Sequence, residues 1–198
     1  MPVKEQGPRL VLASASPRRT AILQDAGIAF ERLATEAEEV RLPGESPAEL
    51  VRRLAETKAR RAAEHVAGPA LIVAADTVVV LDDEVLGKPL SPEDARRMLG
   101  RLSGRTHEVI SGVAVLRLPD SALRAEEEVT RVTFARLSED EIRAYVAAGE
   151  PFDKAGAYAI QGRGGRFVTR IEGCYFNVVG LPLARLCRML RALGWQED

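Results

Sequence analysis

The part of this sequence that most suggests chemistry is a carboxylate set inside an apolar run. Asp76, followed by Thr77, interrupts the segment LIVAADTVVVL at residues 71–81. Such a run, rich in β-branched residues, is typical of a strand buried on both faces. An ionised carboxylate in that setting requires a cation, a metal ion or several hydrogen-bond donors beside it. Asp76 therefore belongs either to a functional site or to a structural network in which backbone N–H groups bind it.

Two lysines are predicted to lie near this carboxylate. Lys58 falls in the apolar stripe of a helix predicted over residues 46–66, where it either extends to water or points inward toward an anion. Lys88, in the segment GKP, follows a turn at residues 82–83 that is expected to fold the chain back along the Asp76 strand. An acid and two bases directed to one place favour an anion-binding site more than any one of them does alone.

Hydroxyl and guanidinium groups cluster at the first predicted junction of a strand and a helix. The segment SASPRR follows a short strand at residues 9–13 and contains Ser14, Ser16, Arg18 and Arg19. Ser16 is a suitable N-cap, and the proline after it suits the first helical turn. Free backbone N–H groups, the positive end of the helix dipole and the arginines would together bind phosphate. The alternative is an ordinary capped helix with solvated arginines.

The last third of the chain contains a stretch dense in glycine and other small residues. Residues 154–165 have the sequence KAGAYAIQGRGG, which would allow the backbone to approach a ligand or another strand closely. Gln161 offers both a donor and an acceptor, the groups needed to recognise the edge of a base. The stretch is either a base-binding segment or a flexible loop.

The intervening segments predict an α/β protein. Strands are expected at residues 9–13, 28–33, 71–81, 84–86, 109–118, 127–136 and 167–171. Helices are expected from residue 16 to about 27, 46 to about 66, 91 to near 100 or 104, 138 to about 149, and 180 to 194. The elements between residues 91 and 149 are expected to act as scaffold.

Composition limits the function classes. With 198 residues, of which 46% are hydrophobic and 29% charged, the chain can bury a substantial core, and we expect one domain over residues 1–198. A net charge of −1 with interleaved acids and bases argues against nucleic-acid and membrane partners. The first residues lack an apolar signal core and no segment is long enough to span a bilayer, so we expect a cytoplasmic protein.

The sequence also limits the kind of metal or nucleotide site. It contains two cysteines and two histidines, and none of them has the spacing of a zinc site. Any metal would instead be bound by carboxylates, which favours magnesium or manganese. The GKP segment lacks the Ser or Thr, and the earlier glycine, of a Walker-type P-loop.

Read together, SASPRR, ADTVV, GKP and DKAGAYAIQG with VVGLPL resemble the Maf family of nucleoside triphosphate pyrophosphatases. The resemblance extends from Leu10 to Leu190, and four ordered motifs are far more specific than one. It implies a single Maf-like domain with a curved mixed β-sheet flanked by helices, two lobes with a central cleft, and a fold like that of inosine triphosphate pyrophosphatases. It also implies cleavage of a nucleoside triphosphate to the monophosphate and pyrophosphate with a divalent cation, and a homodimer.

The resemblance further implies roles for particular residues. Asp76 matches the proton acceptor, and three further positions match polar active-site residues: Glu39, Lys58 and Lys88. Positions linked to base specificity are matched by Arg18, Thr77 and Gln161. The AGAYAIQG form resembles the branch that acts on dTTP and UTP, with modified pyrimidine nucleotides as further candidates.

These residues support a specific hypothesis. Asp76 and Glu39 would hold a magnesium or manganese ion that bridges the triphosphate, while Asp76 orients or deprotonates the attacking water. The lysines and residues 14–19 would neutralise phosphate charge. Two other interpretations stay open: a purine triphosphate pyrophosphatase of the inosine or xanthosine type, and a non-catalytic nucleotide-binding regulator of cell division.

Overall fold

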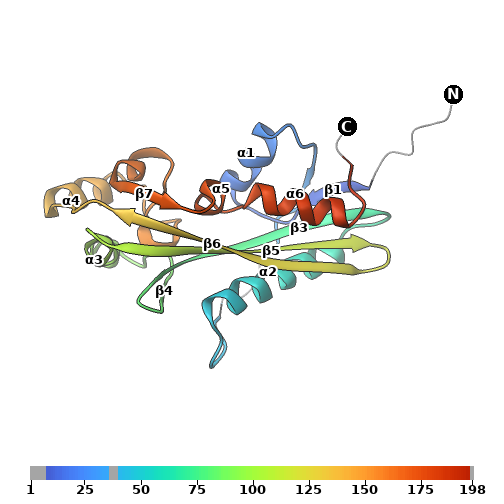
Figure 1. Ribbon diagram of the computed structural model, residues 1–198, viewed down its shortest axis with the longest axis horizontal. Coiled ribbons are helices and arrows are strands. Elements are labelled where there is room, and N and C mark those ends of the chain that lie inside the picture. Colours follow the sequence, from blue (N-terminus) through green and yellow to red (C-terminus); the bar gives the residue numbers. More distant parts are fainter. Residues whose placement is uncertain (1–7, 36–39, 197–198) are drawn as a thin grey trace.

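Long strands with helices on both sides form the protein, whose computed structural model describes residues 8–35 and 40–196 (Figure 1). The strands are β1 (Arg9–Leu12), β2 (Glu31–Arg32), β3 (Ala70–Leu81), β4 (Glu84–Leu86), β5 (Thr106–Leu118), β6 (Ala122–Phe134) and β7 (Val168–Glu172). The helices are α1 (Pro17–Asp25), α2 (Pro47–Ala63), α3 (Pro92–Leu102), α4 (Glu139–Ala147), α5 (Tyr175–Val179) and α6 (Leu183–Ala192). Two short 3-10 helices are η1 (Ala155–Ala157) and η2 (Gly162–Phe167).

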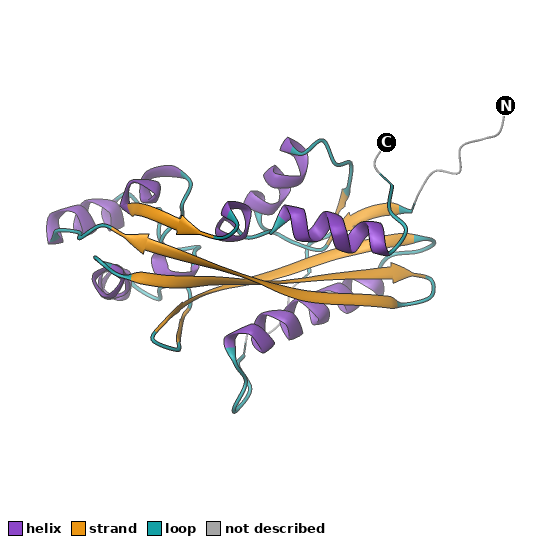
Figure 2. Ribbon diagram, in the orientation of Figure 1, coloured by secondary structure: helices purple, strands orange, loops and turns teal. Residues whose placement is uncertain are grey.

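The strands form one mixed sheet. Its order is β2-β1-β3-β5-β6-β7, with β4 also paired to β3. The β1 strand runs parallel to β2 and β3, whereas the other pairings are antiparallel. Helix α2 covers one face, and α1, α5 and α6 cover the other (Figure 2). The prediction of an α/β fold with a mixed sheet flanked by helices is therefore confirmed.

Strand β3 is the central strand, and its side chains alternate between the two faces. Every residue in it is buried except Thr77, which is half-buried. Residues such as Leu71 and Val73 pack toward α1 and α6, whereas Ile72 and Ala74 pack toward α2. Asp76 follows the second set, so its carboxylate lies on the face that α2 covers. The expected strand with both faces buried is confirmed.

The partners of β3 leave a gap beside its middle. Strand β1 pairs with residues 70–73 of β3, and β4 pairs with residues 79–81 on the same side. Strand β5 pairs along the whole opposite side, from residue 70 to residue 80. Residues 74–78 therefore lie between the ends of β1 and β4, and the carboxylate-bearing part of the strand adjoins an opening in the sheet.

Helix α2 begins and packs as its sequence predicts. Ser46 accepts a hydrogen bond from the Glu49 amide, while the Glu49 carboxylate accepts one from the Ser46 amide, which completes a capping box. Its apolar side chains, including Val51 and Leu54, are buried against the sheet, and Lys58 is buried among them. The helix ends at Ala63 rather than near residue 66.

Several predicted boundaries were wrong. The strand expected at residues 28–33 is reduced to Glu31–Arg32, and α5, which directly follows the β7 turn, was not expected at all. Strand β6 begins at residue 122 rather than 127 because it continues directly from the turn after β5. Its acidic residues Glu126 and Glu128 are compensated by Arg185 of α6, at 2.6 Å each. None of the helices in the described part of the chain is long and apolar enough to cross a membrane.

Candidate active site

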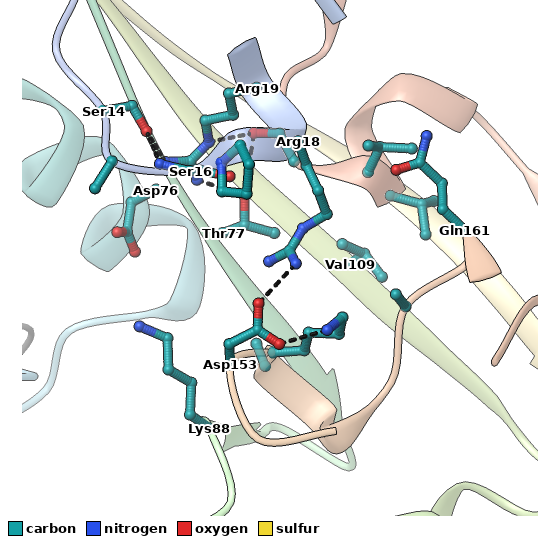
Figure 3. Close-up of a pocket in the computed structure, with 18 of the residues that line it drawn as sticks. Ser14, Ser16, Arg18, Arg19, Asp76, Thr77, Lys88, Val109, Asp153 and Gln161 are labelled. Carbon is teal, nitrogen blue, oxygen red and sulfur yellow. Dashed lines mark hydrogen bonds and ion pairs between the residues drawn. The ribbon is translucent and has the colours of Figure 1, made fainter. Parts of the chain in front are cut away.

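A cavity of about 560 Å³ lies beside the middle of β3, at the gap between β1 and β4 (Figure 3). The residues that line it include nine of the ten predicted from sequence: Ser14, Ser16, Arg18, Arg19, Lys58, Asp76, Thr77, Lys88 and Gln161. The tenth, Glu39, lies outside the described residues. Five separate parts of the sequence thus contribute to a single cavity.

Lys58 and Asp76 form a buried ion pair at one end of the cavity. The Lys58 Nζ atom donates to the Asp76 Oδ1 atom, and the two residues are only 8% and 6% exposed. Asp76 is in regular strand pairing with Gly112 of β5, so it lies within the ladder and not at a bulge or strand end. A buried carboxylate that is paired with a cation and adjoins a cavity is typical of a catalytic or ligand-binding site.

At the junction between β1 and α1, the side-chain cap predicted for Ser16 is not formed. Ser16 is the N-cap of α1 but its side chain makes no capping bond. The Ser14 Oγ atom accepts from the Ser16 amide at 3.2 Å, which precedes the first helical turn, so the α1 N-terminus has no side-chain cap. The N-terminus of α1 nevertheless faces the cavity, since residues 14–19 all line it.

Arg19 has a different role from the one its motif suggested. Its guanidinium donates to the carbonyl oxygens of Ala75 and Gly180, at 2.8 Å each. It also donates to the hydroxyl oxygens of Ser14, at 3.3 Å, and Thr77, at 3.2 Å. Arg19 therefore joins α1, β3 and the segment before α6 at the cavity wall, and most of its donors are occupied by the protein.

The Thr77 hydroxyl is part of the same network. Its Oγ1 atom lies 2.8 Å from Ser111 Oγ, and Ser111 Oγ in turn donates to the Asn177 carbonyl at 3.3 Å. Asn177 is fully buried, and its side-chain amide donates to the carbonyl oxygen of Val109 at 2.9 Å. This polar chain connects the cavity wall to β5, which was expected to act as scaffold, and to α5, which was not expected.

Lys88 is placed by contacts between two loops. The amide of Gly156 donates to the carbonyl oxygen of Gly87 at 3.0 Å. Gly156 has φ +67°, and a Cβ atom there would lie 2.9 Å from the Val79 side chain, so only glycine fits this close approach. Because its residues are small, the stretch at 154–165 packs closely against β3. Its contact with Gly87 also holds the neighbouring Lys88 at the cavity.

Glu150 organises the glycine-rich segment next to Gln161. Its two carboxylate oxygens accept hydrogen bonds from the amides of Arg163, at 3.1 Å, and Gly164, at 3.2 Å, and from the Tyr145 hydroxyl, at 3.0 Å. Burial, and then the charge of Glu150, raise the pKa of the Tyr145 hydroxyl above its ordinary value. The segment after Gln161 is therefore a fixed turn rather than the flexible loop that sequence analysis left open.

Asp153 is a cavity residue that sequence reasoning did not single out. Its Oδ2 atom accepts from Arg18 Nη1 at 3.0 Å, and both residues line the cavity. Asp153 is the first residue of the DKAGAYAIQG motif, but a DK pair by itself resembles any solvated turn, and no role was assigned to it.

Behind the cavity, Tyr158 contacts a buried histidine. His107 Nε2 lies 2.8 Å from the Tyr158 hydroxyl, and both side chains pack edge to face with Phe134. Burial lowers the pKa of His107 to about 4 and raises that of Tyr158. The pair supports the wall on which residues 158–161 lie.

Asp76 offers the kind of ligand that a hard divalent cation binds. Magnesium is commonly held by one or two carboxylates together with substrate phosphates, and a carboxylate at the edge of a cavity lined by Lys88 fits that pattern. Within the described ranges, no group of three or more His, Cys, Asp or Glu side chains could hold a metal ion.

Comparison with known proteins gives consistent results. The family model described as Maf-like protein matches residues 9–193. A dTTP/UTP pyrophosphatase from Symbiobacterium thermophilum is 50% identical, over 94% of this chain and 95% of that protein. A dTTP/UTP pyrophosphatase from Anaeromyxobacter dehalogenans is 52% identical, over 95% of both chains.

A solved structure shares the fold. The Ham1 protein of Staphylococcus aureus has a TM-score of 0.50 and 16% sequence identity, and the match covers 93% of this chain and 99% of that one. The expected likeness in fold extends along nearly the whole chain.

Proposed function

This chain belongs to the Maf family, and we propose that it is a nucleoside triphosphate pyrophosphatase that converts dTTP and UTP to the monophosphate and pyrophosphate. Relatives about half identical over nearly the whole chain have this activity in their names. The observation that supports the proposal most directly is the single cavity that joins the Lys58–Asp76 pair, Lys88 and Gln161.

The reaction would take place at the Asp76 end. Hydrolysis at the α-phosphorus requires a positioned water and neutralisation of phosphate charge. Asp76 would accept the proton of the attacking water, and Lys58 would hold its carboxylate in place through the buried ion pair. Lys88 and the N-terminus of α1, which also line the cavity, would bind the phosphate oxygens.

A divalent metal ion would be held by Asp76 and, we propose, by Glu39. When bound, the ion would neutralise charge on the triphosphate and polarise the phosphorus–oxygen bond to be cleaved. Asp76 would then have two roles, and a carboxylate that ligates a metal directly is a weaker base. Magnesium and manganese both fit these oxygen ligands.

The pyrimidine would bind at the other end of the cavity, beside Gln161. The Gln161 amide can donate to one ring position and accept from its neighbour, as the edge of uracil or thymine requires. Thr77 supports this end indirectly, since its hydroxyl is bonded within the protein. Unpaired polar groups would disfavour the wrong base, and a modified pyrimidine with the same edge would be accepted.

Release of pyrophosphate tests the proposal. The purified protein, with magnesium, should release one pyrophosphate per dTTP or UTP consumed, and a chelator should abolish the release. Faster turnover of inosine or xanthosine triphosphate would identify a purine enzyme instead. Tight nucleotide binding with no pyrophosphate release would identify a non-catalytic regulator. Either result would contradict the proposal.

A further inference from the structure

Arg18 and Asp153 form an ion pair that crosses the cavity. Arg18 extends from the first turn of α1, and Asp153 extends from the segment before η1 on the opposite side (Figure 3). Their side chains meet between Asp76 and Lys88 on one side and Gln161 on the other. The pair therefore lies where the proposed phosphate-binding and base-binding ends meet.

The Asp153 carboxylate is fixed through both of its oxygens. Arg18 donates to Oδ2 at 3.0 Å, and Lys154 donates to Oδ1. Lys154 is itself held by the carbonyl oxygen of Glu150, at 2.6 Å. Partial desolvation of the Asp153 carboxyl opposes ionisation, but the hydrogen bonds from Lys154 and Arg18 outweigh it, so its pKa lies below the ordinary value.

The two cationic sides of the cavity differ in how their cations are held. Asp76 and Asp153 are the only acidic side chains among the described residues that line it. In the described part of the chain, no ion pair involves Lys88, whereas Arg18 and Lys154 share the Asp153 carboxylate. Lys88 is therefore the cation open to a phosphate group, while Arg18, held on Asp153, keeps N–H groups that can donate to neutral carbonyl oxygens.

From this arrangement we propose that Asp153 is a positioning residue, which holds the Arg18 guanidinium so that its remaining N–H groups face the carbonyl oxygens of the pyrimidine. This inference rests on the proposed function and assigns a residue to its specificity. Asp153 acts through Arg18 and does not itself touch the base.

The Arg18–Asp153 ion pair is expected to contribute little to the stability of the fold. The side chains of Arg18 and Asp153 are 28% and 64% exposed, and exposed ion pairs contribute little to folding. The Asp153→Asn variant should therefore melt within about 3 °C of the natural protein. Any large change in its kinetics would then be a change in substrate binding.

Steady-state kinetics with UTP, and inhibition by inorganic triphosphate, test the proposal. In Asp153→Asn the KM for UTP should rise about tenfold, because the Arg18 donor is no longer held by a carboxylate, with kcat changed less than about twofold. The inhibition constant of inorganic triphosphate, which has no base, should stay unchanged. A matching rise in both constants would overturn the proposal, because it would place the pair at the phosphate end.

A matched control and a double variant complete the test. Asp82 is 62% exposed, pairs with Arg105 at 2.6 Å and lies outside the cavity, so Asp82→Asn should match the natural protein. In an Arg18→Ala background, Asp153→Asn should have no further effect on KM. A further rise would show that Asp153 contacts substrate itself and would refute the inference.

The same kinetic measurements distinguish an error in the role of Asp153 from an error in the proposed function. If the natural protein hydrolyses neither UTP nor dTTP, the proposed function is wrong. If it hydrolyses both and Asp153→Asn behaves like Asp82→Asn, only the inference is wrong.

Discussion

Asp76 and Gly112 lie directly opposite each other on the paired strands β3 and β5. A Cβ atom at Gly112 would lie 2.2 Å from the carbonyl oxygen of Val51, so the missing side chain lets the backbone of α2 approach the sheet at this point. Lys58 follows Val51 by about two helical turns and reaches Asp76 because α2 is seated so closely. The glycine thus positions the Lys58–Asp76 pair without contacting it.

Replacing Gly112 with alanine should therefore impair both folding and catalysis. The added methyl group would collide with backbone rather than with a flexible side chain, so α2 must move. We expect a loss of about 3 kcal/mol in the free energy of unfolding and at least about a tenfold fall in UTP turnover. Urea denaturation and a pyrophosphate assay measure these changes.

Gly100→Ala provides the control for that variant. Gly100 lies on an exposed position of α3, and a Cβ atom there would meet nothing within 4 Å. Alanine should raise the free energy of unfolding by about 0.5–1 kcal/mol, because it favours the helix, and should leave turnover unchanged. Equal stability of the Gly112→Ala variant and the natural protein would disprove the role of close packing.

The Lys58–Asp76 pair should contribute both to the stability of the fold and to turnover. Lys58→Met leaves the Asp76 carboxylate buried without this cation, which should lower the free energy of unfolding by about 3 kcal/mol. Asp76→Asn should reduce turnover by about 100-fold or more. In the Lys58→Met background, however, Asp76→Asn should restore part of the stability, as denaturation of all three variants would reveal. Strictly additive losses would contradict a direct pair.

Arg19→Lys should be a damaging substitution despite its conserved charge. The guanidinium uses different nitrogens for Gly180, Ala75 and Thr77, and one lysine ammonium cannot reproduce that geometry. We expect a loss of about 2 kcal/mol in stability and at least about a tenfold loss in kcat/KM. Arg96→Lys, an exposed change on α3, should alter neither quantity. Full activity in Arg19→Lys would show that only the charge matters.

The sequence allowed the central strand and the approach of Lys58 to Asp76 to be predicted because both depend on local patterns. The apolar run around Asp76 predicts a doubly buried strand, and helical periodicity places Lys58 on the buried face of α2. Turn residues at 82–83 predict the hairpin that returns the chain to Lys88.

The network around Arg19 could not be predicted in this way. Two of its acceptors are backbone carbonyl oxygens that lie 56 and 161 residues further along the chain. Every residue has a backbone carbonyl group, so the sequence does not indicate which of them accept a hydrogen bond. Asp153 was missed for a related reason. Its proposed role depends on its ion pair with Arg18, which lies 135 residues away in the sequence. The two residues meet only because the folded chain forms the cavity between them.

Buried His107 should make stability depend on pH. Burial lowers its pKa in the folded protein from 6.5 to about 4, so between these values the unfolded chain binds a proton that the folded protein does not. Stability is therefore lost as pH falls, by about 2 kcal/mol between pH 7 and pH 5. In His107→Gln that part of the pH dependence should disappear, whereas in His65→Gln, at an exposed site, it should persist. Identical profiles for the natural protein and His107→Gln would show that burial does not suppress the protonation.

Glu150→Gln should loosen the segment that carries Gln161. The carboxylate accepts from the amides of Arg163 and Gly164 through different oxygens, and the amide nitrogen of a glutamine cannot accept either bond. We expect faster hydrogen exchange at one of these two amides and a KM for UTP raised about threefold to tenfold, with kcat nearly unchanged. Glu139→Gln, on an exposed position of α4, should change neither measurement. Unchanged exchange together with a raised KM would mean that Glu150 acts on the substrate itself, whereas faster exchange with an unchanged KM would mean that the turn does not position Gln161.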